Sequence, residues 1–68
     1  MTYGKNQLAL LKFLEKYPNR WHIIKGKKAI RAADRMKYRV DCFLTCKDRI
    51  SGKFYVLLKM PQMLIKQN

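Results

Sequence analysis

The first hydrophobic pattern along the chain has the period of a helix. Between residues 5 and 17 apolar residues recur at helical spacing, and lysines gather on the other side. Pro18 and Asn19 are expected to end the element, because the residue before a proline disfavours helical geometry and Asn favours turns. The segment predicts an amphipathic helix with an apolar stripe of Ala9, Leu10, Leu11, Phe13, Leu14 and Tyr17 and a solvent side of Lys5, Lys12 and Lys16. An auxiliary phosphate contact is the alternative for these three lysines.

A short apolar segment follows at residues 20–24. It contains Trp21, Ile23 and Ile24, which favour strands, and it is too short for a helix of its own. We expect a short strand or an extended arm there, ended by a turn at Gly26. Trp21 is expected to anchor the core, and a base-stacking role is the alternative.

The segment 27–39, KKAIRAADRMKYR, has helical periodicity and is dense in basic residues. On a helical wheel at about 100° per residue, its basic and apolar residues separate onto opposite sides, apart from Lys37. The pattern therefore predicts a helix with one core face and one basic face. An arc of about 120° holds Lys27, Lys28, Arg31, Arg35, Tyr38 and Arg39, and the opposite side holds Ala29, Ile30, Ala32, Ala33, Met36 and Val40.

After residue 39 the hydrophobic period changes to two, which is typical of strands. Two alternating segments, 40–47 and 54–59, flank the sequence KDRISGK, which contains the turn formers Asp48, Ser51 and Gly52. Together they predict a β-hairpin with a protruding basic loop.

Both cysteines lie on the first strand of this predicted hairpin. Cys42 and Cys46 would be about 13 Å apart along a strand at roughly 3.3 Å per residue, which is too far for a disulfide. We expect both to be reduced and buried on the inner face of the strand. His22 is the single histidine of the chain, so a metal site is not expected.

The composition indicates one small folded unit. The chain has 68 residues, of which 49% are hydrophobic and 12% aromatic; this suffices for a modest core but not for a second module. We expect a single α+β domain over 1–68, with a core at about 5–60 and a C-terminal tail at 61–68. No signal-peptide pattern or membrane-spanning segment is recognisable, so a cytoplasmic location is expected.

The charge balance indicates a negatively charged partner. Sixteen Lys and Arg residues against four Asp and Glu residues give a formal charge of +12, and such self-repulsion destabilises a compact state unless a polyanion relieves it. The chain shows no paired carboxylates, catalytic triad or phosphate-binding glycine loop, so we expect neither an enzyme nor a cofactor.

The order of these elements resembles a winged helix-turn-helix DNA-binding domain, of the small stand-alone type found in phages and mobile elements. LLKFLEKYPNRWHII is similar to the first helix and strand, KKAIRAADRMKYR to the recognition helix, VDCFLTC to the strand after it and KDRISGK to the wing. The resemblance implies a small winged-helix-like fold and a role in transcription regulation. Such domains carry a further helix before the recognition helix; here residues 18–26 leave room for a single helical turn or for a third strand of the sheet.

A helix of this width fits the major groove, so the 27–39 face is predicted to contact double-stranded DNA. Arg31 and Arg35 are candidates for base contacts, and Lys27 and Lys28, near the helix start, for phosphate contacts. The hairpin loop is expected to follow the backbone or to enter the minor groove. The predicted nucleic-acid-binding residues are Lys27, Lys28, Arg31, Arg35, Tyr38, Arg39, Lys47, Arg49 and Lys53.

Other partners fit the same charge. A basic surface permits RNA as much as DNA, and a phage-type factor would instead cover an acidic patch on a host protein. A homodimer is also open, because symmetric DNA readers often dimerise. Either the tail QMLIKQN at residues 62–68 or an exposed edge of the hairpin would supply its interface.

Overall fold

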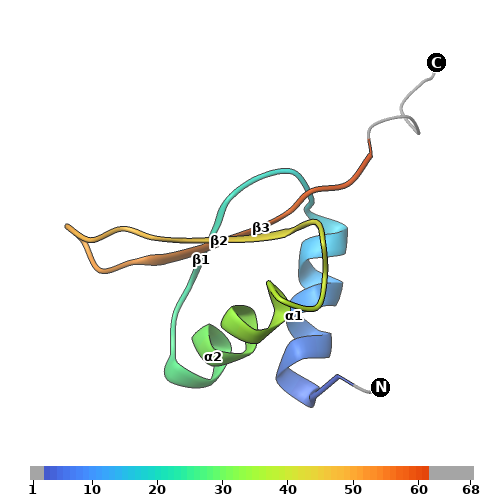
Figure 1. Ribbon diagram of the computed structural model, residues 1–68, viewed down its shortest axis with the longest axis horizontal. Coiled ribbons are helices and arrows are strands. Elements are labelled where there is room, and N and C mark those ends of the chain that lie inside the picture. Colours follow the sequence, from blue (N-terminus) through green and yellow to red (C-terminus); the bar gives the residue numbers. More distant parts are fainter. Residues whose placement is uncertain (1–2, 62–68) are drawn as a thin grey trace.

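The computed structural model describes residues 3–61, which form two helices and three strands (Figure 1). The α+β class predicted from the sequence is confirmed. Residues 18–26 contain a strand and no helix, so the segment supplies a third strand to the sheet. In chain order the elements are α1 (Lys5–Lys16), β1 (His22–Ile24), α2 (Lys27–Met36), β2 (Phe43–Lys47) and β3 (Phe54–Leu58).

The ends of α1 follow from local chemistry. The backbone N–H of Gly4 donates a hydrogen bond to Oε1 of Gln7 at 2.8 Å, across the first turn of the helix. The side chain of Gln7 is itself buried, which holds this contact in place. At the other end Tyr17 leaves helical geometry, with φ −129°, immediately before Pro18. The helix thus ends where the sequence predicts.

The three strands form one antiparallel sheet in the order β1-β3-β2, so β3 is the central strand. The pairing of β2 with β3 continues one step beyond both ends of these strands. The N–H of Lys59 donates to the carbonyl of Cys42 at 2.8 Å, and the N–H of Asp48 donates to the carbonyl of Lys53 at 2.9 Å. The hairpin is therefore longer than its two formal strands.

Both helices cover the same face of the sheet (Figure 1). The large side chains of Leu14 in α1, Met36 in α2 and Val56 in β3 are completely buried, so both helices and the central strand contribute to the enclosed core. Burial of these side chains is the main stabilising contribution of a fold this small. The core consists of Leu14, Ala33, Met36, Phe43, Val56 and Leu58.

The inner face of β2 differs from the prediction. Phe43 is buried at 2% exposure, whereas Cys42 and Cys46 are exposed, although both are unpaired thiols as expected. Residues opposite one another in a sheet point to the same face, and Phe43 lies opposite Leu58, a core residue. The period of two was right, but the expectation of buried cysteines was wrong because the larger aromatic side chain occupies the core.

Trp21 is not a core anchor, contrary to the expectation from the sequence. Its side chain is 48% exposed. The next residue, His22, pairs with the buried Val56, and successive residues of an extended chain point to opposite sides. Trp21 is therefore directed away from the helices, toward the side of the sheet that no other described element covers.

Among residues 3–61, no helix is long and apolar enough to cross a membrane. The interface predicted in the tail 62–68 lies outside the described residues.

Candidate nucleic-acid interface

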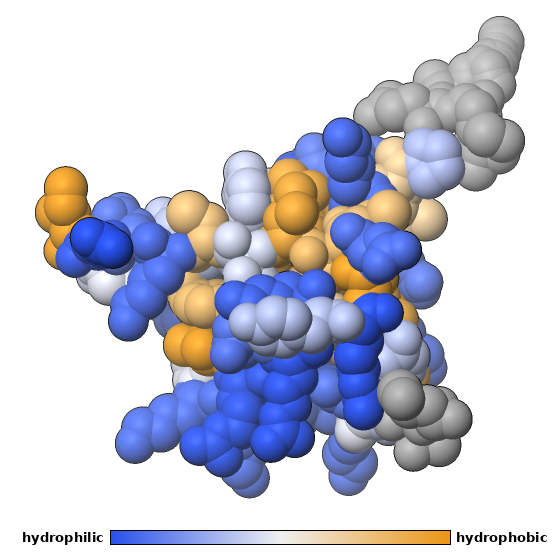
Figure 2. All heavy atoms as spheres, in the orientation of Figure 1, coloured by the Kyte–Doolittle hydropathy of each residue, from blue (hydrophilic) through white to orange (hydrophobic). Residues whose placement is uncertain are grey.

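Helix α2 has the two faces that the helical wheel predicts. Gly26 precedes the helix with φ 95°, a left-handed conformation that glycine adopts without strain. Ala32, Ala33 and Met36 are buried against the rest of the molecule. The basic residues of the helix, Lys27, Lys28, Arg31 and Arg35, are exposed. Figure 2 shows the resulting concentration of strongly hydrophilic side chains over α2.

The helix is shorter than predicted, because it ends at Met36 and not at residue 39. The N–H of Tyr38 donates to the carbonyl of Arg35 at 3.2 Å, and the N–H of Arg39 to that of Met36 at 2.9 Å. These hydrogen bonds join residues three apart in the sequence, so they tighten the chain into a turn that leads toward β2. Tyr38 and Arg39 therefore do not continue the helical arc, and their wheel positions were wrong.

The two displaced residues occupy different surroundings. Tyr38 is 81% exposed, with the Lys37 ammonium 5.1 Å from its ring centroid. The guanidinium of Arg39 lies 5.6 Å from the ring centroid of Tyr3, which precedes α1. Arg39 is thus directed to the N-terminal segment by a cation–π contact.

A shallow groove of about 340 Å³ lies between the first turn of α1 and the basic face of α2. It is lined by Lys5 and Asn6 from α1 and by Lys28, Arg31 and Arg35 from α2. None of the described residues that line it carries a carboxylate. Four neighbouring cations repel one another, and a bound anion would relieve this repulsion.

Lys5 is the cation of this groove that the predicted set of nucleic-acid-binding residues did not include. Its spacing with Lys12 and Lys16 indicated a solvent face, and in isolation α1 has that face. The packing of α1 against α2 brings its first turn, and Lys5 with it, beside Arg31. No spacing along the chain signals this, because the contact depends on how the two helices cross.

A second hollow, of about 450 Å³, lies between α2 and the strand residues that adjoin the hairpin loop. Lys27 and Arg31 line it from the helix, and Lys47 lines it from the end of β2. Asp34 also lines it and carries a compensating charge. Its carboxylate lies 3.1 Å from the ammonium of Lys37, and this hydrogen bond raises the pKa of Lys37. The second hollow is consequently less positive than the first.

The hairpin loop is organised around the side chain of Asp48. Its Oδ1 accepts the N–H of Ile50 at 3.0 Å, and its Oδ2 accepts the hydroxyl of Ser51 at 2.8 Å. The Ser51 hydroxyl and then the Ile50 N–H hold the pKa of Asp48 below its ordinary value. Gly52 closes the loop with φ 77° and an N–H donated to the carbonyl of Asp48 at 2.7 Å. The loop therefore has a defined shape.

The predicted loop residues Arg49 and Lys53 lie at the end of the hairpin, which projects beyond α2 (Figure 1). Both are exposed. Between them Ile50 is 98% exposed, and Figure 2 shows an apolar group at this end of the molecule. The loop thus presents an apolar side chain between two basic ones.

Apart from Tyr38 and Arg39, the predicted residues form three groups in space. Lys28, Arg31 and Arg35 share the groove beside α1, and Lys27 and Lys47 meet Arg31 in the second hollow. Arg49 and Lys53 stand apart at the hairpin loop. In the described part of the chain, no three His, Cys, Asp or Glu side chains are grouped so that they would hold a metal ion.

Comparison with known proteins adds no relative. No protein-family model, curated protein sequence or solved structure matches this chain. The function proposed below therefore rests on the charge and geometry of the surface.

Proposed function

We propose that the protein binds double-stranded DNA as a small winged-helix-like regulator, with α2 as its recognition helix. The observation that carries the proposal is the groove in which Lys28, Arg31 and Arg35 meet Lys5. Apart from Lys5, these cations stand on the exposed side of α2, whose other side is buried in the core. Such a helix can enter the major groove without loss of core packing.

Each group of cations has a distinct role in this arrangement. Arg31 and Arg35 read base edges, since a guanidinium offers the bidentate geometry that guanine accepts. Lys5 and Lys28 bind phosphates along one wall of the major groove. Lys27 lies at the start of α2, where the helix dipole also favours an anion.

The hairpin acts as the wing. Lys47 lies beside α2 and follows the same backbone, while Arg49 and Lys53 extend to the next minor groove. The apolar side chain of Ile50 is exposed on the loop that Asp48 organises, so it can contact a wall of the minor groove. The sheet order β1-β3-β2, with the hairpin next to the basic helix, supports the resemblance to a winged helix that the sequence indicated.

The test is a titration of the protein with random-sequence duplex DNA at several salt concentrations. The logarithm of the affinity should fall linearly with the logarithm of the salt concentration, with a slope of about −0.9 for each phosphate contacted. Selection from a random duplex library then shows whether a preferred sequence exists. An affinity that does not change with salt contradicts the proposal.

Arg35→Ala and Arg20→Ala are matched variants, because each removes one exposed arginine charge. Arg20 follows the far end of α1, about 18 Å along the helix axis from the groove. Arg35→Ala should weaken duplex binding about tenfold or more and alter the selected sequence, whereas Arg20→Ala should have a small effect. Equal losses contradict the assignment to α2. Tighter binding of structured RNA than of duplex DNA would assign RNA as the partner. Co-purification of an acidic protein, without a DNA shift, would assign a protein partner.

A further inference from the structure

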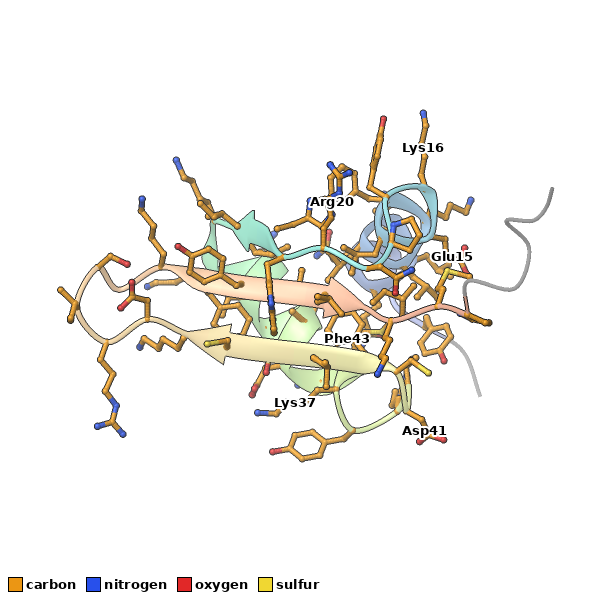
Figure 3. All side chains as sticks on the ribbon, turned by 90° about the horizontal axis from the view of Figure 1, so that it is seen from above. Glu15, Lys16, Arg20, Lys37, Asp41 and Phe43 are labelled. Carbon is orange, nitrogen blue, oxygen red and sulfur yellow. The ribbon has the colours of Figure 1, made fainter. Side chains whose placement is uncertain are left out.

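Within residues 3–61, one face of the sheet is left without a cover. Both helices pack against the opposite face (Figure 1), and the view from above shows the strands in front of α2 (Figure 3). Antiparallel sheets with one face on the core normally carry polar side chains on the other. Here the uncovered face is largely apolar: Trp21, Ile23 and Leu44 are each between 45% and 48% exposed.

The register aligns these apolar side chains into two rows across the sheet. In one row Ile23, Tyr55 and Cys46 lie opposite one another on β1, β3 and β2. In the next row Leu57 lies opposite Leu44, and Trp21 extends the row because it precedes His22, the partner of Val56. We call these six residues the apolar belt: Trp21, Ile23, Leu44, Cys46, Tyr55 and Leu57.

Two aromatic side chains of the belt share one hollow. Trp21 and Tyr55, together with Cys46, line a shallow depression of about 250 Å³. The register places Trp21 diagonally across from Tyr55, a spacing over which aromatic side chains reach one another. The depression is open and aromatic, which suits a flat ring more than a long aliphatic side chain.

Lysines stand at both ends of the belt. On β3 the alternation places Lys53 and Lys59 on the same side as Tyr55 and Leu57, one step beyond each end of the strand. The side chains of both lysines are exposed. The backbone N–H of Asp48 donates to the carbonyl of Lys53 across the hairpin. The carboxylate of Asp48 already accepts hydrogen bonds from Ile50 and Ser51.

We propose that the apolar belt binds single-stranded nucleic acid. Trp21 and Tyr55 stack on bases, and Lys53 and Lys59 bind the phosphates on either side of them. Aromatic rings on a sheet with flanking cations are the elements that bind single strands without regard to sequence. This site lies on the opposite side of the sheet from α2, so it is separate from the recognition helix, and it shares only Lys53 with the proposed wing.

A second copy of the chain is a weaker candidate for the same face. Each copy carries a formal charge of +12, and two belts packed together would bring the lysines at their ends toward one another. The long-range repulsion between the two copies opposes association, whereas a polyanion gains from the same charge.

The test uses Trp21, the single tryptophan of the chain. Oligothymidylate and oligouridylate of about eight nucleotides are titrated into the protein, and Trp21 fluorescence is followed. Stacking should quench the fluorescence saturably with either oligonucleotide, and the affinity ratio of the two tells whether DNA or RNA is preferred. Absence of quenching with both overturns the proposal.

Matched variants identify the residues involved. Tyr55→Leu should weaken binding about tenfold, whereas Tyr38→Leu, which removes a tyrosine that is 81% exposed outside the belt, should not. The double variant Lys53→Gln and Lys59→Gln should bind the oligonucleotides more weakly than the double variant Lys12→Gln and Lys16→Gln. Equal effects within either pair of variants contradict the site. Circular dichroism of each variant checks that the fold is retained.

The remaining outcomes separate this site from other occupants and from the duplex site. Sedimentation that shows a dimer with Trp21 already shielded from a soluble quencher assigns the face to a second copy and overturns the proposal. Arg31→Ala with Arg35→Ala should abolish duplex binding yet leave the quenching by oligothymidylate unchanged. Loss of both together shows that one surface serves both ligands, which also overturns it.

Discussion

The side-chain amide of Asn19 is hydrogen bonded to the backbone of Met60, 41 residues further along the chain. The N–H of Met60 donates to Oδ1 of Asn19 at 2.9 Å. The backbone N–H of Asn19 in turn donates to the carbonyl of Leu58 at 2.9 Å. Asn19 adopts φ 62°, a left-handed conformation in which Asn is among the residues most often found. One turn residue therefore joins the end of α1 to the end of β3.

Asn19→Ala should lower the free energy of unfolding by about 1–3 kcal/mol, because it removes one hydrogen bond and places a Cβ in left-handed geometry. Asn19→Gly should cost less, since it loses the same hydrogen bond without the backbone strain. Urea unfolding of the three proteins measures both differences. If Asn19→Ala and the wild type unfold at the same urea concentration, the Met60 contact makes no net contribution.

Adjacent residues of β2 should respond in opposite ways to truncation. Phe43 is 2% exposed and Leu44 is 45% exposed. Phe43→Ala should therefore destabilise the protein by about 3–5 kcal/mol, whereas Leu44→Ala should cost less than about 1 kcal/mol. Thermal or urea unfolding tests the pair. A larger loss for Leu44→Ala would mean that β2 faces the helices through its other side.

Both cysteines should react with a water-soluble thiol reagent in the folded protein. Cys42 and Cys46 are exposed, and neither forms a disulfide. The Ellman reaction should proceed without denaturant, and addition of urea should reveal no further thiol. A thiol that reacts only after unfolding would show that this cysteine is buried, as the sequence had predicted.

The hairpin loop should make stability depend on pH in the acid range. The pKa of Asp48 is lowered by the Ser51 hydroxyl and the Ile50 N–H, so the folded state favours the ionised carboxylate. The contribution of the Asp48 carboxylate to the stability of the fold is fully present above the ordinary carboxyl pKa of about 4. It is lost as the pH falls through the lower pKa of the folded state. The melting temperature should differ between wild type and Asp48→Asn at pH 7, and less so at pH 3. A difference that grows on acidification would contradict this sign.

Lys5 should contribute to duplex binding as much as the cations of α2 do. Lys5→Ala should weaken the affinity about as much as Lys28→Ala, because both line the same groove, and each should reduce the salt slope by about one phosphate contact. Lys12→Ala, on the same helix, is the control and should change neither quantity. If Lys5→Ala resembles Lys12→Ala, α1 takes no part in the interface.

Periodicity and local chemistry were sufficient to predict much of the fold. The change from a helical period to a period of two gave the right kind of element for each helix and strand, although the second helix ends at Met36 and not at residue 39, because burial on one face imposes these periods. Pro18 and Gly26 marked the ends of elements correctly, since they restrict or permit backbone angles independently of the rest of the molecule. The separation of basic and apolar residues on α2 was likewise readable from spacing alone.

By itself the sequence determined which segments become helices and strands, and that α2 carries its charge on one side. Only the tertiary structure decided that Phe43 and not the cysteines faces the core, that Trp21 lies on the outer face, and that Lys5 joins Arg31 in one groove. Local pattern gives the period of a strand but not its phase when both sides are apolar, because the phase depends on the partner strand. The position of Lys5 depends on how α1 crosses α2, and that is set by packing between residues distant in the chain.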